Sequence, residues 1–300
     1  MSRTRLGAVR AGSTGVFLGS LAAQPAAVIR PVVAEMEELG YGTLWVGETI
    51  GREAFVFSAL LLAATSRLVL ATGIANIYVR DPTATANAAR ALQDGWPDRF
   101  ILGLGVSHKP SVEGRGHAYE RPVATMRAYL EQMTAASWRG PALDLPPLVL
   151  AALGPRMAAL AAEKTAGAYP YFVPTEQVRM MREAMGPEPF LAADLPVVLA
   201  SSRPEARKIA DGHTSRYLGT ANYRNNLLRL GWSEADLEPP GSDRLFDAIV
   251  AWGDVSAIRA RVEAHRAAGA DQVVFNLVTA DPSRPYVEEL RELAQLTRAE

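Results

Sequence analysis

Two ionisable side chains, His108 and Glu48, each follow an apolar run of the sequence and are candidates for acid–base chemistry. A histidine has an unperturbed pKa of about 6.5, so its surroundings decide whether it holds or releases a proton near neutral pH. A carboxylate can serve in the same way when burial raises its pKa. Tyr78 is a further candidate proton donor. In the alternative, structural interpretation, His108 hydrogen-bonds a loop and Glu48 pairs with an arginine such as Arg52.

The apolar run that begins at Arg67 is rich in branched residues and breaks at Gly73 into polar residues and Pro82. Such a run is typical of a strand buried on both faces. Because glycine has no side chain, a flat ligand can rest against the backbone where this strand ends. A bulge or tight turn without a ligand fits the same residues.

The segment Leu153-Gly154-Pro155-Arg156 leads from an apolar run directly into a helical pattern. The first backbone N–H groups of a helix attract anions, and Arg156 would add positive charge, so this segment is a candidate phosphate site. A solvated arginine in the first helical turn is the alternative. The sequence has no cysteine, no clustered His and Glu ligands and no Gly-Lys-Ser/Thr loop. We therefore predict neither a metal site nor P-loop chemistry.

Composition narrows the class of protein. The chain has 300 residues, 49% of them hydrophobic, with 31 basic and 32 acidic side chains. A chain of this length can bury a large core, and its balanced charge gives no field that would attract nucleic acid or an anionic membrane. We expect neither partner. The absence of cysteine fits a cytoplasmic protein, and we read no signal peptide or membrane span in the sequence.

Short apolar runs alternate with longer helical patterns along the chain. Eight strands, each followed by a helix, predict an α/β fold, namely a (β/α)8 TIM barrel. We expect this barrel to form one domain over residues 1–300. In such a barrel the active site lies at the carboxyl ends of the strands. A doubly wound open sheet is the alternative, but the first strand–helix junction lacks the dinucleotide-binding fingerprint. An insertion is expected at residues 213–254, after the seventh strand and a helix at Pro204–Gly212. The expected strands are Thr14–Leu18 (or Leu6–Val9), Thr43–Glu48, the run from Arg67 to Gly73, Phe100–Val106, Leu148–Ala152, Ala168–Val173, Pro196–Ala200 and Gln272–Leu277.

Three segments, Leu70–Pro82, Arg99–His108 and Leu153–Met157, resemble the bacterial luciferase-like monooxygenase superfamily and, more narrowly, its deazaflavin-dependent oxidoreductases. The resemblance implies a TIM barrel, most often a homodimer. It also implies that the cofactor ring lies over a bulge at the end of the third strand. In the family this bulge often contains a non-proline cis peptide, which would fall near Thr72-Gly73-Ile74.

The resemblance also implies roles for individual residues. The ring would lie over the bulge at Thr72, Gly73 and Ile74, and Asn76, Ser107 and His108 would meet the ring or the substrate. The cofactor phosphate would lie against Leu153, Gly154, Pro155 and Arg156, and Glu48 would face the substrate. One departure concerns Tyr169, because a histidine often stands at this position in the family. The expected catalytic residues are thus His108, Glu48 and Tyr78.

Three functions are open at this point. The first is hydride transfer between coenzyme F420 and an unidentified small organic substrate, with His108 or Glu48 moving the accompanying proton. The second is an FMN-dependent monooxygenase that receives reduced flavin from a partner reductase and activates oxygen. The third is a non-enzymatic relative that binds its cofactor weakly or not at all. The loops that carry Tyr119, Tyr217 and Tyr223 have no motif that names a substrate.

Overall fold

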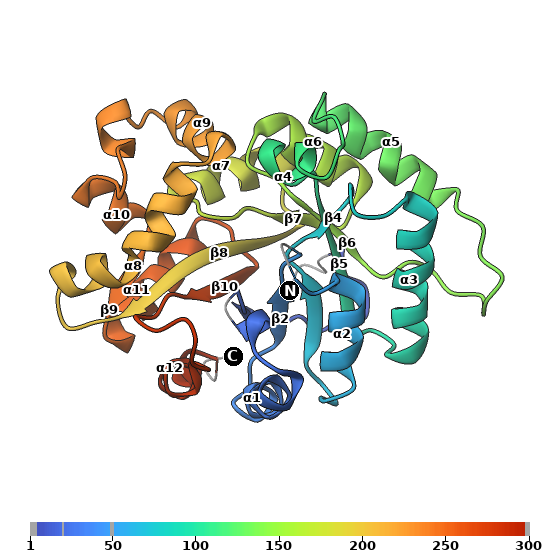
Figure 1. Ribbon diagram of the computed structural model, residues 1–300, viewed down its shortest axis with the longest axis horizontal. Helices are drawn as coiled ribbons and strands as arrows, with labels where there is room; N and C mark the ends of the chain where they lie inside the picture. Colours follow the sequence, from blue (N-terminus) through green and yellow to red (C-terminus); the bar gives the residue numbers. More distant parts are fainter. Residues whose placement is uncertain (1–4, 20, 49–50, 298–300) are drawn as a thin grey trace.

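A closed ring of parallel strands forms the centre of the computed structural model, which describes residues 5–19, 21–48 and 51–297. The ring closes because β10 (Gln272–Leu277) pairs with both β1 (Thr14–Phe17) and β8 (Phe190–Leu199). Helices surround the ring (Figure 1). The predicted TIM barrel is therefore confirmed, and the open sheet is wrong. The other strands are β2 (Thr43–Val46), β3 (Val69–Thr72), β4 (Ala75–Asn76), β5 (Phe100–Gly105), β6 (Leu148–Ala151), β7 (Gly167–Tyr169) and β9 (Ala251–Gly253).

The helices alternate with these strands along most of the chain. In the described part of the chain, no helix is both long and apolar enough to cross a bilayer. The α-helices are α1 (Ala26–Glu38), α2 (Ala54–Leu62), α3 (Pro82–Gly95), α4 (Lys109–Glu113), α5 (Pro122–Thr134), α6 (Pro155–Lys164), α7 (Thr175–Met185), α8 (Arg203–Leu218), α9 (Ala221–Arg229), α10 (Asp243–Ile249), α11 (Val255–Ala267) and α12 (Val287–Leu293), with short 3-10 turns η1 (Leu21–Ala23), η2 (Glu234–Leu237) and η3 (Ala294–Leu296).

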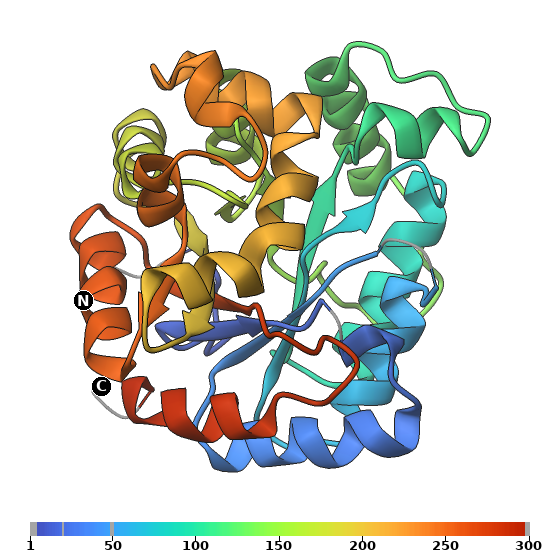
Figure 2. The same ribbon diagram turned by 60° about the vertical axis from the view of Figure 1, so that its left-hand side comes forward.

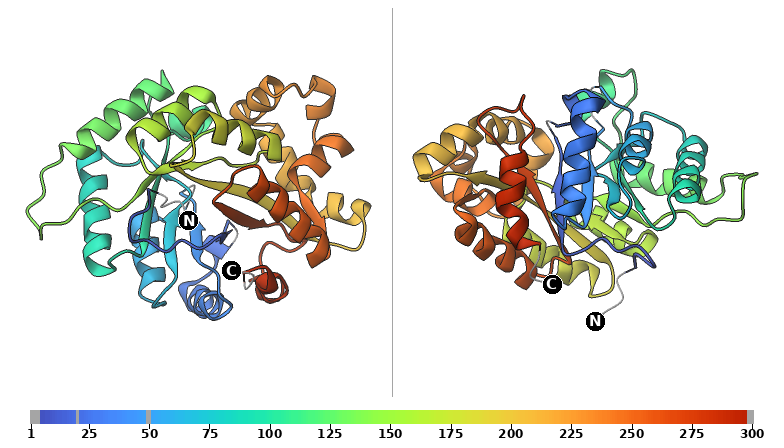
Figure 3. Two further views of the ribbon diagram at one scale, coloured as in Figure 1. Left: turned by 180° about the vertical axis from the view of Figure 1, so that it is seen from behind. Right: turned by 90° about the horizontal axis from the view of Figure 1, so that it is seen from below.

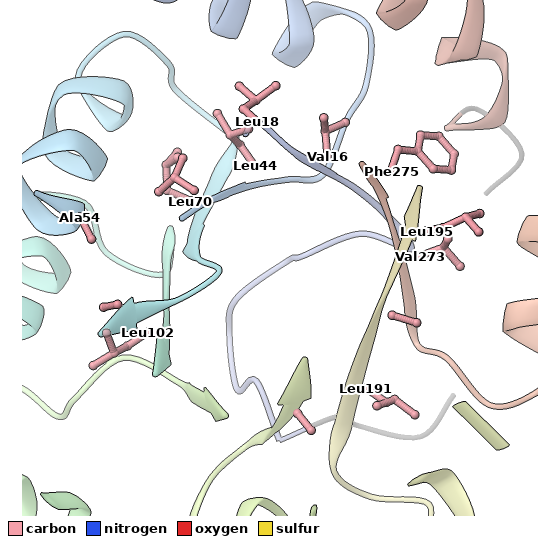
Figure 4. Close-up of a cluster of buried hydrophobic side chains, with 14 of the residues drawn as sticks. Val16, Leu18, Leu44, Ala54, Leu70, Leu102, Leu191, Leu195, Val273 and Phe275 are labelled. Atoms are coloured by element: carbon pink, nitrogen blue, oxygen red, sulfur yellow. The ribbon is translucent and has the colours of Figure 1, made fainter. Parts of the chain in front are cut away.

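Successive strand residues point to opposite sides of the barrel wall. One side faces the barrel interior and the other faces the surrounding helices, so the strands are buried on both faces. Leu44 belongs to the core between strands and helices, whereas its neighbour Trp45 lies in the barrel interior. Figure 4 shows side chains of the outer core, which includes Leu44, Leu70 and Leu102. Leu6 belongs to the interior cluster but lies in a turn, so the alternative first strand at Leu6–Val9 is wrong.

The third barrel strand is interrupted where the sequence places Gly73. β3 ends at Thr72, the Gly73–Ile74 peptide bond is cis as the resemblance implied, and β4 resumes pairing with β5 at Ala75. A Cβ atom on Gly103 of β5 would lie 1.8 Å from the carbonyl oxygen of Thr72. Glycine at position 103 is therefore required for the backbone of the bulge to pass this close.

The region after the seventh barrel strand differs from the prediction. β8 begins at Phe190, not at Pro196, and α8 continues through Gly212 to Leu218. A glycine costs a helix only about 1 kcal/mol, and burial of Leu218 offsets this cost. The predicted insertion therefore begins inside α8, and it includes β9, which pairs with the end of β8. Figure 2 shows α8 and α9 stacked on one side of the barrel.

The first and last of the described α-helices are neighbours. Helices α1 and α12 lie side by side (Figure 3), joined by an ion pair between Glu35 and Arg291. The hydroxyl of Tyr41, which follows α1, donates a hydrogen bond to the carbonyl oxygen of Leu290 at 2.8 Å. These contacts close the helical layer over β1 and β10.

Candidate active site

A cavity of about 1060 Å³ lies at the carboxyl ends of the barrel strands. Its floor and walls come from the ends of β2, the β3–β4 bulge, β5, β6 and β7, and α8 and α9 supply the remaining side. Among the residues predicted from the sequence, the cavity is lined by Glu48, Gly73, Ile74, Asn76, Ser107, His108, Leu153, Gly154, Pro155 and Arg156. The structure thus brings segments from across the sequence to one space.

Two predicted residues, Thr72 and Tyr78, do not line this cavity. The Thr72 hydroxyl donates to the carbonyl oxygen of Gly103 at 2.7 Å and accepts from its N–H at 2.8 Å, so it is used inside the barrel wall. Tyr78 faces a separate, shallower groove of about 600 Å³ that is also lined by His117 and Tyr129. Neither residue is placed to meet a ligand in the larger cavity.

Glu48 is held by hydrogen bonds on both carboxylate oxygens. It accepts from the N–H of Asn76 at 2.8 Å and from the N–H of Ala54 at 3.2 Å, and it forms a two-armed ion pair with Arg80. Arg52, the partner suggested by the sequence, donates instead to main-chain carbonyl oxygens. With its oxygens engaged, Glu48 is better suited to fixing the bulge than to moving a proton.

His108 stands at the cavity wall as predicted, held by a residue from another part of the chain. Its Nδ1 lies 3.0 Å from Oδ1 of Asn222 on α9. Because a carbonyl oxygen only accepts, Nδ1 carries the proton and Nε2 is left with a free lone pair. Burial lowers the pKa of His108, although the hydrogen bond to Asn222 acts in the opposite direction. The imidazole is therefore neutral and able to accept a proton at neutral pH.

Aromatic rings form the inner wall. Tyr169, at the position where the family often has a histidine, stacks on Trp45 with ring centroids 4.4 Å apart. Tyr171 packs edge-on against Phe17 at 5.5 Å. A Cβ atom on Gly73 would lie 2.9 Å from the Tyr169 ring. Gly73 thus provides a close approach between the bulge and this stack, and a side chain there would displace the aromatic wall.

Basic side chains and the start of α6 make part of the cavity electropositive. Helix α6 begins at Pro155, which has no N–H, and the N–H of Met157 donates to the carbonyl oxygen of Gly154, so in the first turn the N–H of Arg156 is left for an anion. Arg156 is exposed, and Arg229 donates to the carbonyl oxygen of Leu153 at 2.9 Å. Arg115 and Arg216 also line the cavity, whereas its only described carboxylate, Glu48, is paired with Arg80.

Several lining residues were not assigned from the sequence, notably Arg216, Asn222 and Arg229. They lie on α8 and α9, and no local motif connects them with the strand ends. The abundance of Arg and Asn in this segment was the only available signal. Within the described ranges, no three His, Asp or Glu side chains gather as metal ligands would.

Comparison with known proteins gives the family. The family model for luciferase-like monooxygenase matches residues 11–272. The chain belongs to this family. A Mycobacterium tuberculosis protein with the provisional name coenzyme F420-dependent oxidoreductase is 27% identical to this luciferase-like chain, over 94% of the chain and 98% of the relative. This luciferase-like protein is thus an oxidoreductase.

Solved structures of the same fold include an F420-dependent secondary alcohol dehydrogenase in complex with an F420–acetone adduct, with a TM-score of 0.73 and 14% identity over 95% of this chain and 98% of that one. The coenzyme F420-dependent tetrahydromethanopterin reductase of Methanopyrus kandleri has a TM-score of 0.72 and 17% identity, over 96% and 97% of the two chains. At these identities the likeness shows that the luciferase-like fold is shared.

Proposed function

We propose that this protein transfers hydride between coenzyme F420 and a small organic substrate. The observation that carries the proposal is a single cavity lined by aromatic rings, a glycine-containing bulge and four arginines. A deazaflavin cofactor has a flat ring and an anionic tail, so it matches both kinds of lining. The name of the mycobacterial relative supports the same cofactor.

The residues present fit such a group. Gly73, Ile74 and Asn76 form the surface against which the ring would lie. The N–H and the side chain of Arg156, at the start of α6, would hold the phosphate, because a free helical N–H and a guanidinium both favour an anion. When bound, the cofactor would supply hydride transfer.

His108 supplies the proton chemistry in this proposal. When a substrate alcohol is oxidised, the hydride leaves its carbon and the hydroxyl proton passes to the lone pair on Nε2. In the reverse direction, protonated Nε2 returns that proton to the substrate oxygen. The hydrogen bond from Nδ1 to Asn222 holds the ring in the tautomer that this role requires.

Titration with the two cofactors tests the proposal. The purified protein would be titrated with F420 and, separately, with FMN, and quenching of cofactor fluorescence would give each dissociation constant. We expect F420 to bind at least tenfold more tightly than FMN. Tighter binding of FMN would favour the monooxygenase supplied by a partner reductase, and binding of neither would contradict a redox function.

We also propose a homodimer that buries the outer face of α2. This helix reads AFVFSALLL, and its one polar residue, Ser58, is already buried. Val56 is 70% exposed on the opposite face. The other residues of α2 are buried or half-buried, so a partner that covered Val56 would complete the burial of an apolar helix. Light scattering gives the molecular mass of the wild type and of Val56→Glu in solution. We expect a dimer for the wild type and a monomer for the variant, and a monomeric wild type would contradict the proposal.

A further inference from the structure

A row of three polar side chains runs from the barrel wall to the cavity. Nδ2 of Asn276, on β10, donates to the hydroxyl of Tyr171 at 2.7 Å. The Tyr171 hydroxyl lies 2.8 Å from the hydroxyl of Tyr217 on α8. Both tyrosines line the cavity. The row therefore joins a barrel strand, the loop after β7 and the segment that covers the site.

The amide nitrogen of Asn276 only donates, so it uses one acceptor position on the oxygen of Tyr171. Either tyrosine hydroxyl can donate to the other. A ligand that accepts from Tyr217 selects the arrangement in which Tyr171 donates to Tyr217. Tyr171 is also the inner ring of the pair, packed against Phe17 and Tyr169. The proton of Tyr217 is then the one left over at the end of the row, on the cavity side.

Asp194 fixes the loop that carries Tyr171. Its N–H donates to the carbonyl oxygen of Pro170 at 3.1 Å, and its Oδ2 accepts from the N–H of Phe172 at 3.1 Å. Residues on both sides of Tyr171 are thus tied to one fully buried residue of β8. Phe172 is held with φ of 54°, a conformation that side chains rarely adopt without such support. The position of the Tyr171 hydroxyl is therefore well determined.

The surroundings of Tyr217 indicate the kind of ligand. Its ring lies 5.0 Å from Tyr223, 4.9 Å from Phe172 and 5.1 Å from Tyr171, measured between centroids. Aromatic faces favour a flat or cyclic apolar body. The hydroxyl of Tyr217 lies at the end of the hydrogen-bonded row among these rings, and an uncharged acceptor oxygen on the ligand would pair with its proton.

We propose that Tyr217 donates a hydrogen bond to the oxygen of a cyclic or aryl ketone, or of the alcohol related to it, and that Asn276 and Tyr171 are positioning residues that orient this donor. The inference rests on the proposed redox function, since it names the class of substrate for that site. It adds a specificity-determining contact supplied by α8, beside Tyr223, whose ring also lies 5.5 Å from that of His108.

Paired isosteres test the donor directly. Acetophenone and α-methylstyrene have nearly the same shape, but the second has CH2 in place of the carbonyl oxygen. Calorimetric titration of the full chain with each gives a ratio of affinities. We expect acetophenone to bind about tenfold more tightly to the wild type, and we expect Tyr217→Phe to reduce the ratio to about one. Asn276→Leu should reduce it to an intermediate value, since the donor remains but is no longer oriented.

Tyr41→Phe is the matched control. It removes a buried hydroxyl whose hydrogen bond to Leu290 lies away from the cavity, so the ratio should stay at the wild-type value. If Asn276→Leu does not fold, Tyr171→Phe interrupts the same row with a smaller change. A wild-type ratio near one, or an unchanged ratio in Tyr217→Phe, would overturn the proposal.

The two proposals fail in different ways. F420 titration of the same variants reports the redox function, whereas the isostere ratio reports the donor. Loss of F420 binding with a retained ratio overturns the redox function alone. Normal F420 binding in a wild type that does not distinguish the two isosteres overturns the assignment of Tyr217 alone.

Discussion

Glu48 and Arg80 form a buried two-armed ion pair that ties the end of β2 to the segment after β4. Their side chains are only 3% and 12% exposed. Arg80 also pairs with Glu53 at 2.5 Å, and its guanidinium lies 4.9 Å from the centroid of the Phe55 ring. The same carboxylate accepts from the N–H of Asn76, so the pair fixes the bulge from one side.

Loss of Arg80 should therefore destabilise the segments around the bulge and lower the free energy of unfolding. Arg80→Met leaves the Glu48 carboxylate buried without its cation, which typically costs about 3–5 kcal/mol of unfolding free energy. Adding Glu48→Gln to Arg80→Met should recover part of the loss, because the unpaired charge is then removed. Urea unfolding of the three proteins measures this. Arg127→Met, in the exposed pair with Glu163, is the control and should have little effect.

Arg156→Glu should weaken cofactor binding by roughly 10-fold to 100-fold, because it places a like charge beside the phosphate. Fluorescence titration with F420 measures the change. The control is Arg179→Glu, which makes the same change at an exposed residue of α7 that does not line the cavity. Equal affinities for the two folded variants would remove the start of α6 from the cofactor site.

His108→Ala should retain cofactor affinity and lower the single-turnover rate of hydride transfer by about 100-fold or more. Because burial lowers the pKa of His108, the neutral, proton-accepting form persists to a lower pH than for an exposed histidine. In the oxidative direction, the wild-type rate should therefore decline only below about pH 6.5. A variant that lost cofactor affinity but kept the rate would assign His108 to ring binding.

Asp194→Asn should change how stability depends on pH. Burial raises the pKa of Asp194 to about 8 from its ordinary 3.8, and the groups around it are tyrosines and Asn276. The native state thus holds a proton that the unfolded chain releases, so this contribution to stability is complete below about pH 4 and is lost as pH rises to about 8.

Thermal unfolding at several pH values tests this sign. The difference in unfolding midpoint between Asp194→Asn and the wild type should become steadily more positive as the pH rises from 4 to 8. For Asp211→Asn, an exposed change on α8, the difference from wild type should stay nearly constant. A constant difference for Asp194→Asn as well would show that its carboxyl has the same pKa in both states.

The barrel could be predicted from the sequence because its strands and helices are each recorded in local patterns. The apolar run that ends at Gly73, for example, specifies both a buried strand and the position of the bulge. Thr72 was misassigned because neighbouring strand residues face opposite sides, and its hydroxyl is used by Gly103. Local patterns could not show this pairing.

Long-range partners also limited prediction of the site. Glu48 and Arg80 are far apart in the sequence, and nothing local selects Arg80 over Arg52. The contact between His108 and Asn222 likewise depends on how α9 returns over the strand ends. Such side chains are brought together by the tertiary structure, so their pairing became visible only in the folded chain.

The segment formed by α8 and α9 could change in sequence between related enzymes without changing the barrel. Tyr217, Asn222 and Arg229 all line the cavity, and Arg229 donates to the carbonyl oxygen of Leu153, just before α6. The segment leaves the barrel after β8 and returns at β9, so its sequence can drift while the strand pairing is preserved. Grafting residues 203–250 from a relative, up to the start of β9, should therefore exchange substrate preference as one unit, while the bulge and the start of α6 stay unchanged.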